Sequence, residues 1–280
     1  MRDDRGPPKL AVLRGLLADL PGAVVAYSGG ADSAFLAFVA HQVLGDRGVA
    51  VTADSSSLPR LDLELASDFA RRHGIPHRIV RTHELEDADY ARNDGDRCAF
   101  CKEHLLRALL EDRDLAELGP VLLGVNVDDL SDHRPGQDAA RRQGARFPLA
   151  EAGLAKVEVR ELSRDLGLET WDRPGSACLA SRIAYGVPVT REALQRVERS
   201  ESAIRALGFH GDLRVRDQGH DLARIEVGIG DLPAILARRR EVVAEVKAAG
   251  FLFVTLDLEG YRAGSHNLLL GIGRPGRHRP

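Results

Sequence analysis

The chain has few of the residues on which small secreted proteins and membrane proteins depend. Its 280 residues include three cysteines, one tryptophan and one methionine, and only 5% are aromatic. Three cysteines are too few, and odd in number, for a disulfide framework. No apolar run approaches the roughly 20 residues of a membrane-spanning helix, and the N-terminal segment has no export signal. We therefore expect a cytoplasmic protein that does not contact a membrane.

Positive charge is carried almost entirely by arginine. Of 39 basic residues only four are lysines, at positions 9, 102, 156 and 247, so each retained lysine is a mild sign of chemistry. The net charge is −3 and the isoelectric point about 6.4, which argues against a broad surface for nucleic acid. The final segment is locally basic, and we expect residues 271–280 to form a flexible tail.

Strand-like and helix-like segments alternate through the first two thirds of the chain. The apolar runs that predict strands are 23–26, 49–52, 77–80 and 121–125. The stretches that predict helices are 31–43, 58–73 and 101–113. This order is typical of a doubly wound parallel sheet, an α/β fold in which ligands bind beyond the carboxyl ends of the strands.

From about residue 188 the pattern changes to that of a smaller α+β domain. The expected helices are 191–207 and 231–249, and the expected strands are 213–216, 222–227 and 251–256. We predict a nucleotide-binding domain over 1–187 and a domain for substrate binding or oligomerisation over 188–270, followed by the tail.

The segment Ser28–Ser33, Ser-Gly-Gly-Ala-Asp-Ser, joins the first predicted strand to the first predicted helix. Adjacent glycines allow the backbone to approach an anion, the serines donate hydrogen bonds, and the helix N-terminus presents free N–H groups. The order of residues differs from the Walker loop and from Gly-x-Gly-x-x-Gly. The segment predicts a pyrophosphate site, with an unliganded glycine-rich turn as the alternative.

The three cysteines are a second sign of chemistry. Cys98 and Cys101 form a Cys-x-x-Cys pair, and Cys178 lies alone. The residues leave open a redox pair, a zinc site completed by Cys178 with or without His104, an iron–sulfur cluster, or inert cysteines. Three thiolates would leave one iron of a [4Fe–4S] cluster without a protein ligand, and that iron could hold a labile sulfide.

The segment Ser28–Ser33, called the phosphate loop below, resembles the PP-loop of the ATP pyrophosphatases. These enzymes cleave ATP between the α and β phosphates and adenylate a carbonyl or carboxyl oxygen. The resemblance implies that Ser28, Gly29, Gly30, Asp32 and Ser33 hold the β and γ phosphates. Asp32 is also a candidate ligand of Mg²⁺, which prefers oxygen. The alternative for Asp32 is a helix-capping role.

Further stretches make the resemblance more specific and are similar to the LarE family. They are 52–60, 97–102, 128–136, 171–186, 214–227 and 258–265. The LarE family inserts sulfur into pyridinium-3,5-biscarboxylic acid mononucleotide during nickel-pincer nucleotide synthesis. The resemblance implies that ATP converts a carboxylate to an adenylate, from which a sulfur nucleophile displaces AMP.

The family obtains this sulfur in two ways. In one, the cysteine matching Cys178 forms a thioester with the substrate and loses its sulfur, leaving dehydroalanine. In the other, three cysteines hold a [4Fe–4S] cluster that carries a replaceable sulfide. The presence of Cys98 and Cys101 beside Cys178 favours the cluster, and the sacrificial cysteine stays open as an alternative.

The resemblance and the chemistry of the residues assign further contacts with ATP. Asp54 and Ser55 follow the second predicted strand and are expected to meet the adenosine, unless they form a solvated loop. Lys156 matches a family position that reaches ATP phosphate. The residues expected to frame the same crevice are Asp128, Asp129 and Arg134, of which one aspartate is expected to contact the ligand.

Guanidinium groups are the expected ligands of the substrate phosphate, because their donor fork matches phosphate. The candidates are Arg182, Arg214 and Arg216, with His220 and Arg224 weaker. Arg214 and Arg216 lie two apart on a predicted strand and hence on one face. A second metal site is left open among Glu198, Glu201, Glu226 and Asp231. Trp171 could be a core or loop anchor or a stacking partner.

Three rival functions compete with sulfur transfer to a mononucleotide. A PP-loop tRNA thiolase would need a basic surface, which the net charge of −3 does not supply. An amidating PP-loop synthetase needs no thiols, and a non-catalytic nucleotide-binding subunit would keep the fold without releasing pyrophosphate. The family suggests a homohexamer, a sulfide source and a downstream nickel-inserting protein as partners.

Overall fold

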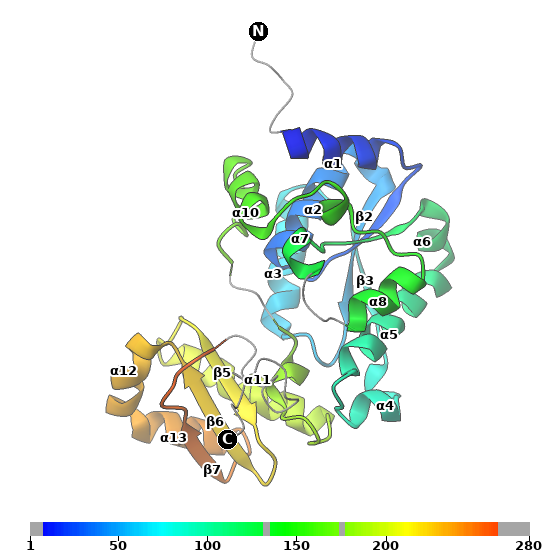
Figure 1. Ribbon diagram of the computed structural model, residues 1–280. Helices are drawn as coiled ribbons and strands as arrows, with labels where there is room; N and C mark the ends of the chain where they lie inside the picture. The colour runs from blue at the N-terminus through cyan, green and yellow to red at the C-terminus, as the bar shows by residue number, and fades with distance from the viewer. Residues whose placement is uncertain (1–7, 131–134, 174–176, 263–280) are drawn as a thin grey trace, which may run out of the picture. The chain divides into compact units, whose positions relative to one another are not determined.

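The computed structural model describes residues 8–130, 135–173 and 177–262 (Figure 1). The chain forms two compact units. Unit 1 comprises Met1–Glu84 and Cys98–Ser176, and unit 2 comprises Leu85–Arg97 and Ala177–Pro280. Contacts thus assign the short excursion 85–97 to the second unit, whereas the domain boundary expected between residues 187 and 188 stays a prediction. The expected tail, 271–280, lies outside the described residues.

Unit 1 is built on a parallel four-stranded sheet in the order β3-β2-β1-β4. The strands are β1 (Ala23–Ala26), β2 (Gly48–Asp54), β3 (His77–Arg81) and β4 (Val121–Leu123). β1 pairs in parallel with both β2 and β4, so the strand order reverses between β1 and β4. The four predicted strands are confirmed, and the switch between β1 and β4 is where doubly wound sheets bind ligands.

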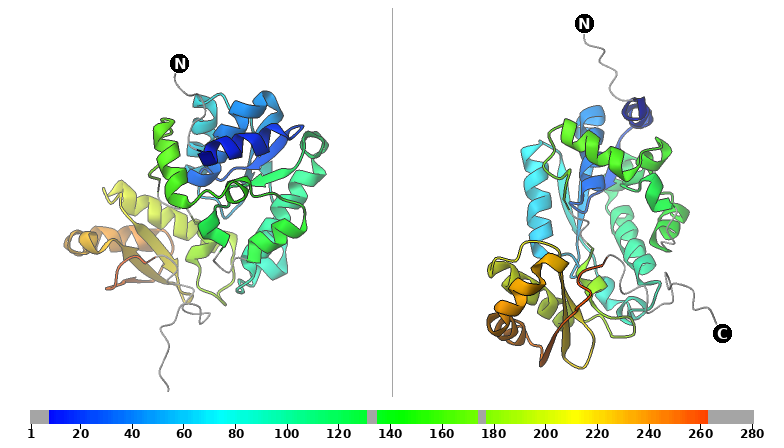
Figure 2. Two further views of the ribbon diagram at one scale, coloured as in Figure 1. Left: turned by 45° about the horizontal axis from the view of Figure 1, so that its top comes forward. Right: turned by 60° about the vertical axis from the view of Figure 1, so that its left-hand side comes forward.

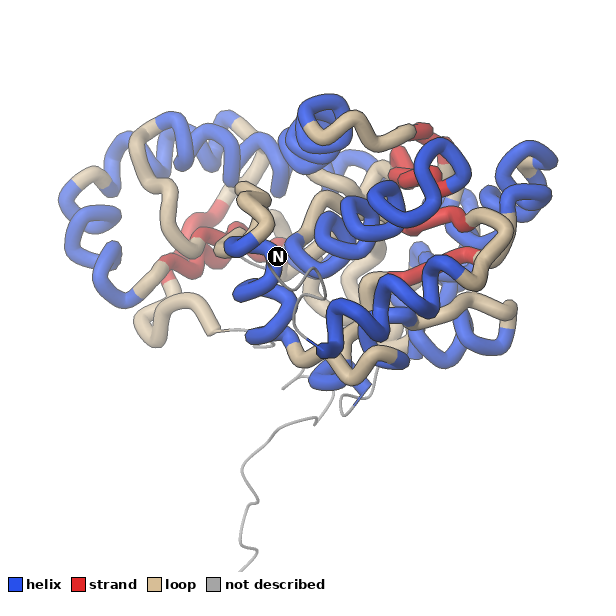
Figure 3. The backbone as a smooth tube through the Cα atoms, turned by 90° about the horizontal axis from the view of Figure 1, so that it is seen from above, coloured by secondary structure: helices blue, strands red, loops and turns tan. Residues whose placement is uncertain are grey.

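Helices cover both faces of this sheet (Figures 2 and 3). They are α1 (Pro8–Ala18), α2 (Ala31–Leu44), α3 (Arg60–Arg72), α5 (Arg97–Glu111), α6 (Arg113–Leu118), α7 (Val127–Leu130), α8 (Pro135–Arg142), α9 (Pro148–Glu151) and α10 (Lys156–Asp165). The three helices predicted in this region are confirmed as α2, α3 and α5. The alternating α/β pattern therefore produces the expected fold class.

The side chains of β1 divide the core of unit 1 in two. Val25 packs with buried residues of α1, α2, α3 and α10, whereas Val24 packs with those of α5 and α6. Successive side chains of a strand point to opposite faces, so an apolar run such as Ala23–Ala26 supplies both layers. All four residues of β1 are buried. The phosphate loop thus follows a strand that is held on both sides.

Unit 2 is the smaller α+β fold that the sequence predicts. Its three-stranded sheet has the order β5-β6-β7, with β5 antiparallel and β7 parallel to β6. The strands are β5 (Leu213–Asp217), β6 (Leu222–Val227) and β7 (Phe253–Leu256). The helices are α4 (Ala88–Ala91), α11 (Arg191–Ala206), α12 (Leu232–Ala237) and α13 (Arg239–Ala248), with a 3-10 turn at Leu179–Arg182.

The single helix predicted over 231–249 is wrong, because α12 and α13 are separated at Arg238. This residue has φ −99° and ψ 20°, outside the range of a continuing helix. Its guanidinium donates to the carbonyl of Leu207 and to the carboxylate of Glu241. The break therefore coincides with a tertiary contact that helical periodicity does not reveal.

No helix in the described part of the chain combines the length and apolarity needed to cross a membrane.

Candidate functional site

The phosphate loop connects β1 to α2 and has an ordered hydrogen-bond pattern. Gly29 has φ +75°, a conformation that favours glycine, and Gly30 is the N-cap of α2 without a side-chain cap. The Ser33 hydroxyl donates to the Gly30 carbonyl (3.1 Å) and accepts from the Ser28 N–H (3.3 Å). The two serine hydroxyls lie 3.2 Å apart. Both serines are thus held at the N-terminus of α2.

A glycine after β4 allows this helix to come close to the sheet. A Cβ on Gly124 would lie 2.8 Å from the Ser33 nitrogen and 2.9 Å from its Cα. Gly124 also ends the strand predicted over 121–125, since β4 stops at Leu123. In contrast, a Cβ on Gly30 would meet only the Ser28 hydroxyl, at 3.6 Å. The space beside Gly30 is therefore open to a ligand.

Asp32 lies in the first turn of α2 and receives a hydrogen bond from the loop after β4. The Asn126 amide donates to the Asp32 carboxylate at 3.3 Å. The Asn126 side-chain oxygen accepts from the N–H groups of Asp128 (3.0 Å) and Asp129 (3.1 Å), so it also caps α7. Asn126 was not among the predicted site residues. Its place directly after the strand predicted over 121–125, whose loop was expected at the ligand-binding edge of the sheet, was the signal that could have found it.

Two cations act on the same carboxyl group. Burial raises the pKa of Asp32, and the charges of Lys156 and Arg160 oppose that rise. The backbone N–H of Lys156 donates to the Asp128 carboxylate at 2.7 Å. The structure thus brings together three segments predicted for ATP, namely the phosphate loop, the loop after β4 and the start of α10.

Asp54 and Ser55, at the end of β2, are engaged by neighbours within unit 1. Arg60 pairs with the Asp54 carboxylate at 2.5 Å and donates to the Ser55 carbonyl at 2.7 Å. The Ser55 hydroxyl donates to Glu84, whose side chain is 1% exposed. These contacts order the loop after β2. The contact of Asp54 and Ser55 with adenosine stays a prediction.

Other predicted residues of unit 1 differ in their exposure. Cys98 is exposed and Cys101 partly exposed, both in the first turns of α5. Trp171 is 38% exposed and lies under the Arg164 guanidinium, 5.9 Å from its ring centre, so it is not a core anchor. Arg134 lies outside the described residues.

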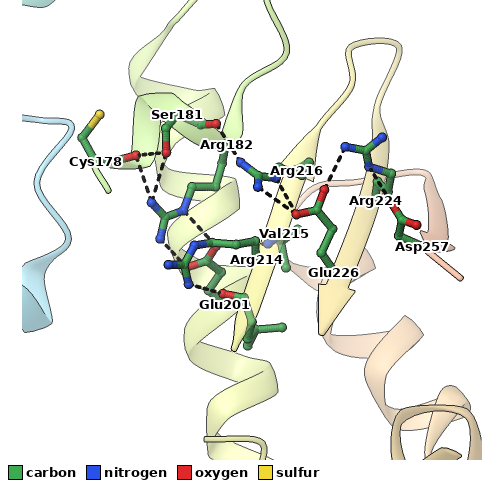
Figure 4. Close-up of polar contacts among 11 residues, drawn as sticks. Cys178, Ser181, Arg182, Glu201, Arg214, Val215, Arg216, Arg224, Glu226 and Asp257 are labelled. Carbon is green, nitrogen blue, oxygen red and sulfur yellow. Dashed lines mark hydrogen bonds and ion pairs between the residues drawn. The ribbon is translucent and has the colours of Figure 1, made fainter. Parts of the chain in front are cut away.

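In unit 2, Cys178 begins the 3-10 turn Leu179–Arg182 (Figure 4). Its carbonyl accepts three hydrogen bonds: from the Ser181 N–H (2.9 Å), the Ser181 hydroxyl (2.7 Å) and the Arg182 guanidinium (3.0 Å). The carbonyl points toward Arg182 and the thiol points away. The thiol-bearing residue is partly exposed on a backbone held at several points.

The arginines predicted to bind phosphate form a buried cluster beside this turn (Figure 4). Arg182 pairs with Glu201 at 3.1 Å, and Arg216 contacts one Glu226 oxygen through two nitrogens at 3.0 and 2.8 Å. Arg216 also donates to the Ser181 carbonyl at 2.9 Å. Arg182 and Arg216 therefore support the Cys178 turn, a role that the sequence did not indicate.

Arg214 and Arg216 lie on the same face of β5, as predicted from their spacing. Burial lowers the pKa of Arg214, and the charges of Arg182 and Arg216 lower it further. Arg214 also lies over the Tyr261 ring, 5.1 Å from its centre. A buried guanidinium with a lowered pKa favours the approach of an anion.

The acidic residues considered for a second metal site have different positions. Glu201 and Glu226 are buried partners of arginines, and Arg224 pairs with the second oxygen of Glu226 at 2.8 Å. Among the residues that the structure describes, no three His, Cys, Asp or Glu side chains are grouped so that they could hold a metal ion. His220 is exposed in the turn between β5 and β6, with φ +49°.

Known proteins resemble the chain along most of its length, although no family model matches it. It is 44% identical over 264 residues to the uncharacterized protein slr1717 of Synechocystis sp., covering 94% of this chain and 98% of that protein. It is 34% identical over 260 residues to the pyridinium-3,5-bisthiocarboxylic acid mononucleotide synthase of Lactiplantibacillus plantarum, covering 92% and 94%.

A more distant similarity extends to another synthase. The chain is 25% identical over 233 residues to one polypeptide of the glutamine-hydrolyzing GMP synthase of Thermoplasma acidophilum, covering 69% of this chain and 74% of that protein. The alignment with the Lactiplantibacillus enzyme covers nearly the whole chain, including the parallel sheet and the Ser28–Ser33 loop. The chain belongs to the family of the pyridinium-3,5-bisthiocarboxylic acid mononucleotide synthase.

Proposed function

We propose that the protein is an ATP-dependent sulfurtransferase acting on pyridinium-3,5-biscarboxylic acid mononucleotide in nickel-pincer nucleotide biosynthesis. A substrate carboxylate oxygen attacks the α phosphorus of ATP, and pyrophosphate leaves. A sulfur nucleophile then attacks the acyl carbon of the adenylate, and AMP leaves with the former carboxylate oxygen. The products are a thiocarboxylate, AMP and pyrophosphate.

The phosphate loop supports the first half of this reaction. Ser28, Gly29, Gly30, Asp32 and Ser33 hold the β and γ phosphates at the N-terminus of α2, whose dipole favours anions. Lys156 and Asp128 lie on the neighbouring segments joined by a 2.7 Å hydrogen bond. Asp32 is the proposed ligand of the Mg²⁺ that accompanies ATP, because its carboxyl is oriented by Asn126.

The observation that carries the second half is the arginine cluster behind the Cys178 turn. Four guanidinium groups, of Arg182, Arg214, Arg216 and Arg224, face three carboxylates, of Glu201, Glu226 and Asp257. Burial and the charges of Arg182 and Arg216 lower the pKa of Arg214, so an anionic ligand beside it would stabilise its charged form. Arg182, Arg214 and Arg216 are the proposed ligands of the substrate phosphate, next to the residue that bears the thiol.

The proposed sulfur source is a [4Fe–4S] cluster held by Cys98, Cys101 and Cys178. Cys98 and Cys101 lie three residues apart in α5, hence on one helix face, which suits two thiolates binding one cluster. When bound, such a cluster supplies a sulfide on the iron that lacks a protein ligand. Cys98 is exposed and Cys101 partly exposed, which suits the sulfur chemistry proposed for the pair.

The alternative is that Cys178 itself donates sulfur. Its thiolate would attack the adenylate carbonyl and expel AMP, forming a thioester. Loss of the Cα proton and cleavage of the Cβ–S bond would then release the thiocarboxylate and leave dehydroalanine. The partly exposed thiol on a fixed turn supports this second candidate.

The test is to mix the anaerobically purified protein with ATP, Mg²⁺ and the biscarboxylate mononucleotide. AMP, pyrophosphate and thiocarboxylate are the expected products, and a folded, iron-loaded protein that forms no AMP would refute the proposal. Cys178→Ser should still release pyrophosphate and accumulate the acyl-adenylate but form no thiocarboxylate, because adenylation precedes sulfur attack and AMP leaves only in the second step.

Iron and acid-labile sulfide analysis separates the two sulfur sources. A colourless protein without iron, even after reconstitution, would exclude the cluster. Mass spectrometry of the spent protein would then show a loss equal to hydrogen sulfide at Cys178. Cys98→Ser and Cys101→Ser should abolish iron binding in the cluster mechanism and leave a single turnover intact in the sacrificial one.

The proposed small-molecule and protein partners follow from this chemistry, and the proposed homohexamer follows from the family resemblance. The partners are a sulfide source, a nickel-inserting protein that takes the product, and further copies of the chain in a homohexamer. Light scattering coupled to gel filtration tests the homohexamer directly, and a monomeric mass would exclude it.

A further inference from the structure

A hydrogen bond from a distant arginine fixes the backbone of the phosphate loop. The Arg173 guanidinium donates to the Gly29 carbonyl at 2.8 Å, across 144 residues of sequence. Its side chain is only 18% exposed. Nothing in the sequence pattern of the phosphate loop points to Arg173.

This contact determines which way the next N–H group points. In a trans peptide the C=O and the following N–H point to opposite sides. Arg173 holds the Gly29 carbonyl, so the Gly30 N–H is directed away from Arg173. Gly29 reaches this orientation with φ +75°, and a Cβ there would lie 3.1 Å from the Ala66 Cβ. Arg173 thus orients the Gly30 N–H donor at the N-terminus of α2, where phosphate is proposed to bind.

Arg173 is itself held at two further points. Its second nitrogen pairs with the Asp62 carboxylate of α3 at 2.8 Å, and that carboxylate is 12% exposed. The Arg173 carbonyl accepts from the Arg160 guanidinium at 3.0 Å. One terminal nitrogen of the guanidinium therefore binds the loop, and the other binds a carboxylate that neutralises the charge of the guanidinium. This geometry suits a support for the backbone better than a direct phosphate ligand.

We propose that Arg173, oriented by Asp62, is a positioning residue that keeps the phosphate loop in its anion-binding conformation. The proposal rests on the proposed use of ATP. It concerns the affinity for the phosphates of ATP and not the later transfer of sulfur. Arg173 acts through the Gly29–Gly30 peptide and does not touch the reacting atoms.

The experiment measures binding of a non-hydrolysable MgATP analogue, and of adenosine, by calorimetry. Arg173→Gln should weaken analogue binding by about tenfold or more, the effect of losing one charge-assisted hydrogen bond. Adenosine binding should change less than about twofold, because it has no phosphates. Arg173→Lys should resemble Arg173→Gln, since an ammonium cannot hold the carbonyl and Asp62 as a planar fork does.

Asp62→Asn separates positioning from direct phosphate binding. If Arg173 positions the loop, Asp62→Asn weakens analogue binding. If Arg173 were a phosphate ligand, the same change would free its charge and strengthen binding, which would overturn the proposal. The double variant should bind no more weakly than Arg173→Gln alone, because both changes act through one contact.

Arg72→Gln is the matched control. Arg72 is the last residue of α3. Its side chain is more exposed than that of Arg173 and pairs with Glu169, at 2.7 Å, rather than with the phosphate loop. It should leave analogue affinity unchanged. If the wild type fails to bind the analogue, the proposed function fails; if it binds and Arg173→Gln binds equally well, only the positioning role fails. Melting temperatures of all variants identify any that fail to fold, in which case Asp62→Asn decides.

Discussion

Replacing Glu226 by glutamine removes the charge that balances two arginines in unit 2. Glu226 is fully buried, and one of its oxygens accepts from two nitrogens of Arg216, at 3.0 and 2.8 Å. Its other oxygen accepts from Arg224 at 2.8 Å. Glutamine has nearly the same volume, so packing is preserved. Its amide, however, presents donors to guanidinium groups that are themselves donors.

The expected loss of stability follows from the burial of each partner. Removing one member of a buried ion pair costs about 3–5 kcal/mol, because the other charge is left uncompensated. Arg216 is 7% exposed and carries this cost, whereas Arg224 is 30% exposed and is partly hydrated. We therefore expect Glu226→Gln to lower the free energy of unfolding by about 3–5 kcal/mol. Arg224→Gln should lower it by about 1 kcal/mol or less.

Urea denaturation followed by circular dichroism measures both changes and their combination. The double variant should be more stable than the sum of the single effects predicts, by about 1 kcal/mol, since removing Arg224 relieves repulsion created by Glu226→Gln. A cost below about 1 kcal/mol for Glu226→Gln would show that Arg216 is not held as a buried charge. Strict additivity would show that Arg216 and Arg224 do not share this carboxylate.

Three further predictions test other parts of the molecule. Burial raises the pKa of Asp32, so protons should compete with Mg²⁺ at pH values above about 3.9, the usual pKa of an aspartate. The Mg²⁺ affinity of the wild type should therefore fall as pH decreases. At low pH the wild type and Asp32→Asn should bind Mg²⁺ equally weakly. A flat difference would contradict this. Asn93 has φ +63° and donates to three carbonyls, so urea unfolding should show Asn93→Ala to be less stable by about 2–4 kcal/mol. Asn93→Gly should be about 1 kcal/mol more stable than Asn93→Ala, and equal stability would argue against strain. Gly124→Ala should weaken MgATP-analogue binding because its Cβ would lie 2.8 Å from the Ser33 nitrogen. A Cβ on Gly15 would have nothing within 4 Å, so Gly15→Ala should raise the free energy of unfolding by about 0.5–1 kcal/mol and leave analogue binding unchanged. If Gly124→Ala and Gly15→Ala had equal effects on analogue binding, the steric argument would be refuted.

Local signals were sufficient to predict the strand, loop and helix around the phosphate site. The expected strand 23–26 coincides with β1, and the expected helix 31–43 differs from α2 by one residue at its end. An apolar run, two glycines and a helical segment follow one another without interruption, so each boundary is marked in the chain. The same reasoning missed the break at Arg238, because that break depends on a contact with Leu207.

The candidate site was predicted in its residue types but not in its contacts. Arg182, Arg214 and Arg216 were expected to bind phosphate, which stays a prediction, and the structure adds that Arg182 and Arg216 hold the Cys178 turn. Asn126 and Arg173 were not predicted as site residues. Their contacts with the phosphate segment join residues 94 and 144 apart, and no spacing rule covers such distances.

The sequence by itself determined the order of the strands and most of the helices, and the presence of a glycine-rich loop at the end of the first strand. Both follow from signals within a few residues, namely hydrophobic periodicity and the conformational freedom of Gly29. Only the tertiary structure decided which charges neutralise one another and which support the backbone. Guanidinium groups are chemically alike in the sequence, and burial together with partners far along the chain gives Arg173, Arg214 and Arg216 their different surroundings.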